Sequence, residues 1–420
     1  MIRMGIIALV FALAQESSPY RLEDMSFTPL DERFSRRGNA TKGLMDQNTN
    51  PANQTPAYDD VYDDQSKNPL PWWNPKGWTK RCWLISAIVF VIIAVVVIAV
   101  SVVEVKENAY PNYSKLDYHL VDTYSGTSFF DNFDFFSETD PSNGFVIYVD
   151  QSGAEWLNLT YATSESAILK VDTSTNVDTS SGRRSVRITS KTQYDSGLFV
   201  FDVAHTPYGC ATWPALWLSD PDNWPTNGEI DVLEAVNTAT DGNQVALHTT
   251  KGCKVDVKRK QTGTSTHTNC YNGTNNNAGC GVKGSDESFG EDFNDDDGGV
   301  YALEYRDSGI RVWWWPRSSI PSDIETSTSN TTNSTTVPDP SGWGKAMADF
   351  PNTHCDISKH FKNQSIIANI NLCGDWASDT YYYTTIADCP GSCENYVQNN
   401  GSEFSEAYWE FRSFRVYQST

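Results

Sequence analysis

Hydrophobic residues divide the chain into three parts with different patterns. Residues 16–79 are polar, rich in Asn, Asp and Pro, and poor in aliphatic residues, which predicts a disordered tail. A short apolar run, Ile6–Ala14, precedes this tail and is typical of the hydrophobic part of a signal peptide. Trp83–Val103 follows as one apolar segment without a charged residue. We therefore predict a tail at 1–82, a membrane span at 83–103, a stalk at 104–117 and a folded domain at 118–418.

The apolar segment is long enough to cross a membrane as one helix. At about 1.5 Å per residue it spans about 30 Å, the thickness of a hydrocarbon core, and it lacks the polar stripe of a buried core helix. Lys76, Lys80 and Arg81 precede it, whereas mostly acidic residues follow. The positive-inside rule then predicts a single-pass type II protein, with the tail in the cytosol and the later part outside the cell or in the secretory lumen. Cleavage after Ala14 is the alternative and would invert this assignment.

Alternation of apolar and polar residues predicts strands throughout the later part of the chain. Ser185–Ser190, Ala302–Arg306 and Tyr408–Tyr417 alternate with a period of two, and Gly, Asn, Asp and Pro separate such runs. Because long helical patterns are missing from this part, we expect an all-β sandwich or jelly roll. Residues 322–341 form a Ser-, Thr- and Asn-rich insertion that predicts a surface loop.

One predicted strand carries three carboxylates, in the sequence Asn-Gly-Glu-Ile-Asp-Val-Leu-Glu-Ala-Val at 227–236. A period of two places Glu229 and Asp231 on one face but turns Glu234 towards the core. One extra residue at Val232–Leu233 returns Glu234 to the face of the other two acids. The pattern therefore predicts a β-bulge, a feature that is common beside active sites. Three acids on one face indicate a shared proton or substrate; the simpler alternative is a solvated acidic edge strand.

Charge and aromatic content narrow the classes of ligand. The chain has 31 basic and 53 acidic residues, with a formal net charge of −22, which disfavours nucleic acid and anionic lipid headgroups as partners. Its 14 Trp and 20 Tyr are more than one core usually holds, and a sugar-binding cleft would account for the excess. No metal-binding or nucleotide-binding motif is visible, so we expect no cofactor and no metal ion, and we expect a monomer.

Cysteines and glycosylation sequons both predict the secretory side for the folded domain. Cys82, at the cytosolic edge of the apolar segment, is expected to be a free thiol, and the even number of cysteines after it predicts a disulfide framework whose pairing stays open. Asn-X-Ser/Thr sequons follow the apolar segment at Asn112, Asn158, Asn272, Asn330, Asn333, Asn363 and Asn400.

Several motifs together carry a resemblance to a known family. They are Tyr124–Phe133, Asp140–Phe145, Trp213-Pro-Ala-Leu-Trp217, Gly228–Glu234, Leu372-Cys-Gly-Asp-Trp376 and Cys389-Pro-Gly-Ser-Cys393. From about Tyr118 to Tyr417 the chain resembles glycoside hydrolase family 16, specifically the fungal laminarinase-like endo-1,3(4)-β-glucanases. The resemblance implies a concanavalin A-like β-jelly-roll sandwich whose concave face binds glucan.

The resemblance also implies a role for each acid. Glu229 would be the nucleophile and Glu234 the general acid/base of hydrolysis with retention, which needs two such carboxyl groups. Asp231 would hydrogen-bond Glu229, and its charge would help to hold a proton on Glu234. His248 is expected to hydrogen-bond the substrate or Glu234.

Further residues are implied to contact the sugar chain. The candidates are Trp213, Trp217, Trp224, Trp376 and His205, with core packing as the alternative for Trp213 and Trp217. One member of Trp313–Trp315 is expected at the edge of the cleft. Family members usually read Gly-Cys-Gly-Thr-Trp-Pro where this chain has Ala211 in place of the second Gly.

The expected activity is hydrolysis of 1,3 or mixed 1,3/1,4 linkages in β-glucan. Two alternatives share the fold. In a cell-wall transglycosylase a sugar hydroxyl, rather than water, resolves the covalent intermediate. A non-catalytic glucan lectin is the other, although intact Glu229 and Glu234 count against it.

Overall fold

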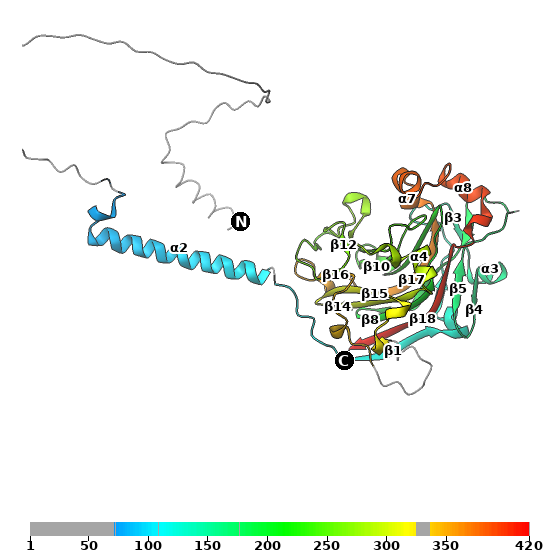
Figure 1. Ribbon diagram of the computed structural model, residues 1–420, viewed down its shortest axis with the longest axis horizontal. Coiled ribbons are helices and arrows are strands. Elements are labelled where there is room, and N and C mark those ends of the chain that lie inside the picture. The colour runs from blue at the N-terminus through cyan, green and yellow to red at the C-terminus, as the bar shows by residue number, and fades with distance from the viewer. Residues whose placement is uncertain (1–70, 72, 108, 176, 325–336, 420) are drawn as a thin grey trace, which may run out of the picture. The chain divides into compact units, whose positions relative to one another are not determined.

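The computed structural model describes residues 71–419, apart from residues 72, 176 and 325–336 and the break at residue 108 (Figure 1). The predicted tail up to residue 70, with its apolar run Ile6–Ala14, lies outside the described residues, as does most of the predicted loop 322–341. Within the tail, Pro75–Gly77 forms a short 3₁₀ turn, η1, capped by the side chain of Asn74.

The predicted apolar segment forms one long helix, α2 (Lys80–Glu107), which extends a few residues beyond both predicted ends. It is the one helix among the described residues that is long and apolar enough to cross a membrane. Its aliphatic side chains are exposed on all sides, as the missing polar stripe predicted. Cys82 is exposed and makes no disulfide.

Two eight-stranded antiparallel sheets form the folded domain as stacked layers (Figure 1), so the predicted all-β sandwich is confirmed. The first sheet has the order β16-β15-β14-β8-β18-β5-β4, with β1 also paired to β18. The second has the order β12-β13-β11-β10-β9-β17-β7-β2, and β3 and β6 form a separate parallel pair. Each sheet joins strands that are far apart in the sequence.

The strands and helices have the following bounds. The strands are β1 (Tyr118–Ser125), β2 (Phe133–Phe135), β3 (Val146–Tyr148), β4 (Thr160–Ala162), β5 (Ala167–Lys170), β6 (Arg183–Ser185), β7 (Arg187–Tyr194), β8 (Gly197–His205), β9 (Thr212–Ser219), β10 (Glu229–Glu234), β11 (Gln244–His248), β12 (Thr264–Ser265), β13 (Cys280–Lys283), β14 (Gly299–Arg306), β15 (Gly309–Pro316), β16 (Ala348–Pro351), β17 (Gln364–Leu372) and β18 (Tyr408–Ser419). The short helices are α3 (Gln151–Trp156), α4 (Glu291–Asp295), α6 (Ile357–His360), α7 (Gly374–Ala377) and α8 (Cys393–Asn399). Short 3₁₀ helices are η2 (Gly126–Asn132), η3 (Pro221–Asn223), η4 (Asn275–Asn277), η5 (Asp286–Ser288), η6 (Arg317–Ser319), η7 (Pro340–Gly342) and η9 (Gly401–Phe404), and η8 (Tyr381–Ile386) is a π-helix.

Strand β14 shows how alternation builds two layers of packing. Its odd-numbered residues Tyr301, Leu303 and Tyr305 join the main core between the sheets, while Val300 and Ala302 join a second cluster on the outer face. Leu116 packs on that outer cluster. The stretch predicted as a stalk therefore includes residues that cover the outer face of the first sheet.

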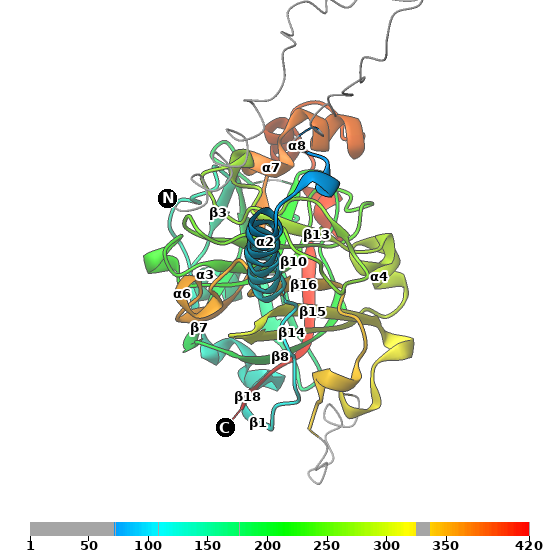
Figure 2. The ribbon, with the colours of Figure 1, turned by 90° about the vertical axis from the view of Figure 1, so that its left-hand side faces the viewer.

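Four disulfides confirm the predicted framework: Cys210–Cys389, Cys253–Cys355, Cys270–Cys280 and Cys373–Cys393. Two of them tie the segment that carries α7, η8 and α8 back to the sandwich. Figure 1 and Figure 2 both show α7 and α8 next to each other at one end of the domain. The segment that carries these helices lies beside the second sheet. Trp376 of α7 lines the cavity described in the next subsection.

Candidate active site

The predicted bulge is present in β10. Against β9, Asp231 pairs with Trp217 and Leu233 pairs with Leu216, so Val232 is left as the extra residue. Ile230, Val232 and Leu233 are buried in the main core. Glu229, Asp231 and Glu234 all line one cavity on the opposite face. The bulge therefore brings three acids to one side of a strand that regular alternation would have divided.

This cavity has a volume of about 760 Å³ and lies over β10, β9, β17 and β7 of the second sheet. It contains the predicted residues Trp213, Trp217, Trp224, His248 and Trp376. It also contains residues that the sequence analysis missed: Asp140, Arg187, Asn369, Asn371, Asp375 and Tyr382. A signal was present for some of these, since Asn369 and Asn371 are polar residues two positions apart in a run of otherwise apolar residues.

Hydrogen bonds to a Trp side chain and an Asn side chain hold Glu234 in place. The indole Nε1 of Trp213 donates to its Oε1 at 2.7 Å, and its backbone N–H donates to the side-chain oxygen of Asn243 at 2.8 Å. Burial raises the pKa of Glu234 well above its usual value, and the negative charge of Asp231 raises it further. Both causes favour the protonated carboxyl group, which is the form that gives a proton to a leaving oxygen in general acid catalysis.

The pKa of Glu229 is also raised. Burial is the main cause that raises its pKa to about 7, and the charge of Asp231 adds to it. The positive charge of His248 and a hydrogen bond from Trp224 act in the opposite direction. Both glutamates therefore have pKa values above that of a free carboxyl group, raised by burial and by the same neighbour, Asp231.

Asp231 lies between the two glutamates and faces His248. The His248 Nε2 lies 3.3 Å from Asp231 Oδ2, and Nδ1 lies 3.1 Å from Asn277 Oδ1. Burial lowers the pKa of His248, but Asp231 and the two glutamates outweigh burial and raise it to about 10. The expected hydrogen bond of His248 to Glu234 is therefore replaced by a contact with Asp231. The cause is register, because His248 pairs with Glu229 across β10 and β11.

Ligand atoms of Glu229, Asp231 and His248 lie within 4.8 Å of one another, as they would in a metal site. A protonated imidazole, however, has no lone pair to offer a metal ion. The raised pKa of His248 thus favours a site that shares protons and negative charge among its side chains.

Comparison with known proteins gives this arrangement its family. A family model described as "XgeA-like, catalytic GH16 domain" matches residues 133–417. The chain belongs to glycoside hydrolase family 16. It is 47% identical over 313 residues to a probable glycosidase of Schizosaccharomyces pombe, which covers 74% of this chain and 71% of that protein. It is 40% identical to the endo-1,3(4)-β-glucanase XgeA of Emericella nidulans over 72% of this chain, but only 47% of that longer protein.

Solved structures agree with this assignment. Laminarinase 16A of Phanerochaete chrysosporium, a family 16 enzyme with 6-O-glucosyl-laminaritriose in its donor and acceptor sites, matches at 43% identity with a TM-score of 0.68. The match covers 72% of this chain and 99% of that one. An elongating family 16 β-1,3-glucosyltransferase matches at 39% identity with a TM-score of 0.65, over 72% of this chain and all of that one. This family 16 member is therefore a glycoside hydrolase by fold and by relatives.

Aromatic residues of this hydrolase form part of the cavity wall. Trp213 and Trp217 are both half-buried and lie on the same side of β9, since pairing with β17 continues regularly through Pro214. The Trp217 indole donates to Asn369 Oδ1 at 2.8 Å. Trp376 meets Trp213 edge to face, with ring centroids 5.9 Å apart. Core packing, the alternative considered for Trp213 and Trp217, therefore does not describe them.

The structure does not bring His205 to the cavity. It lies on β8 in the other sheet, where Nδ1 lies 2.8 Å from the Tyr408 carbonyl oxygen and Nε2 lies 3.2 Å from a carboxylate oxygen of Glu406. The expected contact of His205 with substrate thus has no geometric support. The triplet Trp313–Trp315 is also outside the cavity, because it lies on β15 of the first sheet, where Trp343 packs against its members. The structure thus places both outside the cavity, and residue type alone does not reveal which sheet a strand joins.

Ala211 occupies a position that suits glycine. Its φ of 73° is in the left-handed region, where a Cβ costs about 1 kcal/mol or more. The side chain of Asn237 holds this conformation, because its Oδ1 accepts a hydrogen bond from the Ala211 N–H at 2.8 Å. Backbone conformation therefore accounts for the glycine that relatives usually have here.

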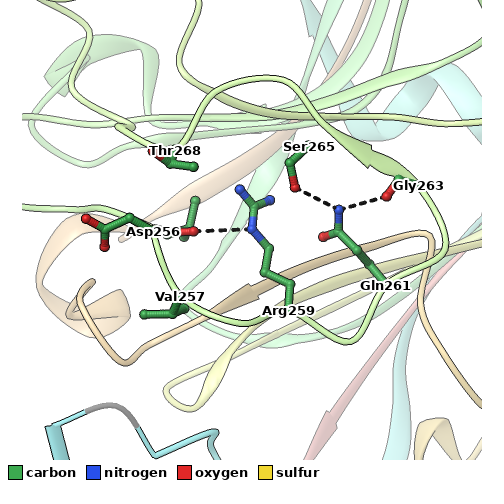
Figure 3. A pocket seen from close by; sticks show the side chains of 8 residues that line it. Asp256, Val257, Arg259, Gln261, Gly263, Ser265 and Thr268 are labelled. Carbon is green, nitrogen blue, oxygen red and sulfur yellow. Dashed lines mark hydrogen bonds between the residues drawn. The ribbon is translucent and has the colours of Figure 1, made fainter. Parts of the chain in front are cut away.

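Figure 3 shows a second hollow, formed by segment 255–268. Its polar groups mainly bind one another: the Arg259 Nε donates to the Val255 carbonyl, and the Gln261 amide donates to Gly263 and Ser265. The one carboxylate in its wall, Asp256, pairs with His354 at 2.7 Å. Since catalysis by this family needs two facing carboxyl groups, this hollow offers no second active site.

Proposed function

We propose that this family 16 enzyme is an endo-β-glucanase that cleaves 1,3 or mixed 1,3/1,4 linkages with retention of configuration. The observation that carries the proposal is the pair of carboxyl groups that the bulge in β10 brings into one cavity. Burial and the charge of Asp231 raise the pKa of both Glu229 and Glu234, and Asp231 and His248 lie beside them. A retaining glycosidase needs one ionised and one protonated carboxyl group on opposite sides of the anomeric carbon.

In the first step, a carboxylate oxygen of Glu229 forms a bond to the anomeric carbon while the bond to the leaving oxygen breaks. Glu234 gives its proton to that oxygen, so the released chain leaves as a neutral alcohol. In the second step, Glu234 accepts a proton from water, the water oxygen bonds to the anomeric carbon, and the ester bond to Glu229 breaks. Asp231 favours this proton transfer from water to Glu234, because its negative charge stabilises the protonated carboxyl group of Glu234.

The substrate class rests on the cavity wall and on relatives. Half-buried Trp213 and Trp217, with Trp376, offer flat apolar faces of the kind that stack on pyranose rings. The named endo-1,3(4)-β-glucanase and the laminarinase with bound β-glucan support glucan as the polymer. Because this chain spans about half of that glucanase, activity of the whole protein is part of the proposal.

Azide rescue tests the two roles separately. With an aryl β-laminaribioside that has a good leaving group, Glu234→Ala is expected to form the glycosyl-enzyme and, with azide, to release a β-glycosyl azide. Glu229→Ala is expected to yield an α-glycosyl azide, because azide then replaces the missing nucleophile. Nuclear magnetic resonance of the azides distinguishes the two products. The same anomer from both variants, or unchanged laminarin hydrolysis in either, would contradict the assignment.

Transglycosylation is a second candidate reaction of the same site. It is favoured by the likeness to a family 16 β-1,3-glucosyltransferase, which is close to that shown with the laminarinase. In that reaction Glu234 accepts a proton from a sugar hydroxyl instead of water. Incubating laminari-oligosaccharides with and without excess acceptor, and measuring product masses, separates the reactions. Products longer than the substrate would favour transfer, whereas shorter products alone would favour hydrolysis.

We also propose that α2 anchors the enzyme in a membrane as a type II protein, with the catalytic domain outside the cell or in the secretory lumen. The apolar length of α2 and the four disulfides support this location. Protease treatment of sealed microsomes is the test. Protection of the catalytic domain together with digestion of the tail is expected, and digestion of the domain would overturn the topology.

A further inference from the structure

A disulfide-closed loop lies at one edge of the cavity. Cys270 and Cys280 are bonded and enclose residues 271–279, which we call the Asn272 loop. Asn272, Asn275, Asn276, Asn277 and Ala278 of this loop line the same cavity as the three acids. Asn277 also contacts His248 at 3.1 Å, so the loop meets the catalytic residues directly.

The loop is held in one conformation by its own contacts. The Asn272 N–H donates to the Thr249 carbonyl at 2.9 Å, and the Thr274 hydroxyl donates to the Tyr271 carbonyl at 2.8 Å. The three asparagines of η4 have φ angles of 51°, 53° and 60°, an unusual run in the left-handed region. These features hold the backbone of the loop beside the cavity.

Asn272 begins the sequon Asn-Gly-Thr, and its side-chain amide makes no hydrogen bond to a described residue. The other sequon asparagines of the described residues differ from it. Asn112, Asn158 and Asn363 are exposed and do not line the cavity. The Asn400 amide already donates to the Tyr396 carbonyl at 3.1 Å. Asn272 is therefore the sequon asparagine that combines an available amide with a position on the cavity wall.

The direction of the sugar chain follows from the acids. Glu229 and Glu234 lie at opposite ends of one strand and must flank the bond that breaks, so the glucan crosses β10 rather than following it. On one side it continues over β9 and β17, where Trp217 and Asn369 line the cavity. On the other side it passes over β11 towards β13, and the Asn272 loop precedes β13 directly.

We propose that Asn272 carries an N-linked glycan that walls the β11–β13 end of the cavity and limits how far a glucan chain extends there. The inference rests on the proposed glucanase activity and on the proposed secretory location. Its functional consequence is a preference for shorter segments of glucan on that side of the cleaved bond. A branched, hydrated glycan restricts this end by occupying space, while the reacting groups stay unchanged.

The test uses the full chain, produced in a eukaryotic secretory host. Removal of glycans by peptide N-glycosidase in heavy-oxygen water converts an occupied Asn272 into labelled aspartate, which peptide mass spectrometry detects. We then compare kcat/KM for polymeric laminarin with that for short laminari-oligosaccharides before and after endoglycosidase trimming. The ratio of polymer to short substrate is expected to rise about fivefold after trimming, which corresponds to about 1 kcal/mol.

Two variants locate the effect. Asn272→Gln is expected to give the raised ratio without trimming and to show no further rise when trimmed. Asn363→Gln, which removes a sequon outside the cavity, is the matched control and is expected to behave as the wild type. An unoccupied Asn272 overturns the inference whatever the enzyme cleaves. An equal rise of the polymer-to-short-substrate ratio in both variants, or no rise in either, would show that the Asn272 glycan does not limit this end of the cavity. A wild-type enzyme that cleaves no β-glucan would instead refute the proposed function, and occupancy alone would then decide the inference.

Discussion

Two groups of acids lie on opposite sheets of the sandwich and differ in what surrounds them. Glu229, Asp231 and Glu234, the cleft carboxylates, lie on the second sheet beside His248. Glu304 and Asp349, the stalk carboxylates, lie on the first sheet beside residues 110–118. Both groups interrupt apolar strands, so residue type alone does not distinguish them.

The stalk carboxylates are saturated with donors. Glu304 accepts from the Arg311 Nε at 2.9 Å and from the Tyr118 hydroxyl at 3.1 Å. Asp349 accepts from the hydroxyls of Tyr110 and Tyr113 at 2.8 and 3.1 Å, and from the backbone of Lys260. Burial and the neighbouring acids raise the pKa of all three tyrosines, so these phenols stay protonated and donate. Such a cluster stabilises packing of the stalk on the sheet.

The cleft carboxylates keep hydrogen-bonding capacity unused. Asp231 Oδ2 is buried and accepts no hydrogen bond of good geometry from the described residues, although His248 Nε2 lies 3.3 Å away. The pKa of Glu229 and that of Glu234 are raised by burial first and by Asp231 second. Acids whose oxygens accept several hydrogen bonds thus mark a structural contact here. Acids with too few hydrogen-bond donors mark the site where substrate and protons supply the missing partners.

The largest expected effect separates activity from stability in the cleft. Glu229→Gln keeps the shape of the side chain but removes the nucleophile, so kcat should fall by about 10⁴-fold or more. The free energy of unfolding should stay equal or rise, because one of three mutually repelling acids is gone. Steady-state hydrolysis of laminarin and urea unfolding measure the two quantities. Full activity, or a large loss of stability, would break the contrast with the stalk carboxylates.

The matching change in the stalk group should have the opposite profile. Glu304→Gln removes the charge that faces buried Arg311, and loss of one partner of a buried ion pair costs about 3 kcal/mol or more. The kcat of the folded enzyme should stay unchanged, since Glu304 is on the other sheet. Thermal unfolding and laminarin hydrolysis below the transition are the measurements. A Glu304→Gln enzyme that folds stably but is inactive would show that the two groups are coupled.

The pH dependence of stability should come from the cleft group. Because the folded-state pKa of Glu229 is raised, its protonated form contributes fully below pH 4.5, and that contribution is lost as pH rises from 4.5 through about 7. Unfolding free energy should therefore decline over this window. Glu229→Gln should make the decline shallower, with the part due to the raised pKa of Glu234 remaining, whereas Glu304→Gln should preserve the whole decline. Urea unfolding across the window measures the slopes, and an unchanged slope in Glu229→Gln would contradict the raised pKa.

The contrast between the two groups of carboxylates also shows which features of the structure could be predicted from the sequence. The bulge was predictable because regular alternation would put Leu233 on the acidic face and Glu234 in the core, and this mismatch lies within one strand. The partner of His248 was not predictable, because it depends on the register of β11 against β10. Asn369 lines the cleft because β17 pairs with β9, a strand that lies more than a hundred residues earlier in the chain. Local patterns are thus readable from the sequence, while contacts set by distant strand pairing are not.

The stalk illustrates the same limit. Residues 104–117 look like a polar spacer because no periodic pattern passes through them. Their role depends on Asp349 and Arg311, which lie about two hundred residues or more later in the chain. Tyr110 and Tyr113, which precede the predicted start of the folded domain at 118, already contact Asp349 of the first sheet.

The smallest expected effect tests whether the stalk contact is spread over several donors. Tyr113→Phe removes one hydroxyl from Asp349 but leaves the ring over the Arg311 guanidinium, 4.0 Å from its centroid, and leaves the donors Tyr110 and Lys260 in place. Loss of one such hydrogen bond should lower the unfolding free energy by about 1 kcal/mol. The kcat and the pH slope of stability should match the wild type, because neither depends on this cluster. Tyr110→Phe is the matched variant. Urea unfolding of both variants measures how much each hydroxyl contributes to the unfolding free energy. A loss from Tyr113→Phe as large as that from Glu304→Gln would show that Tyr113 anchors the cluster, and the picture of saturated, shared donors would then fail.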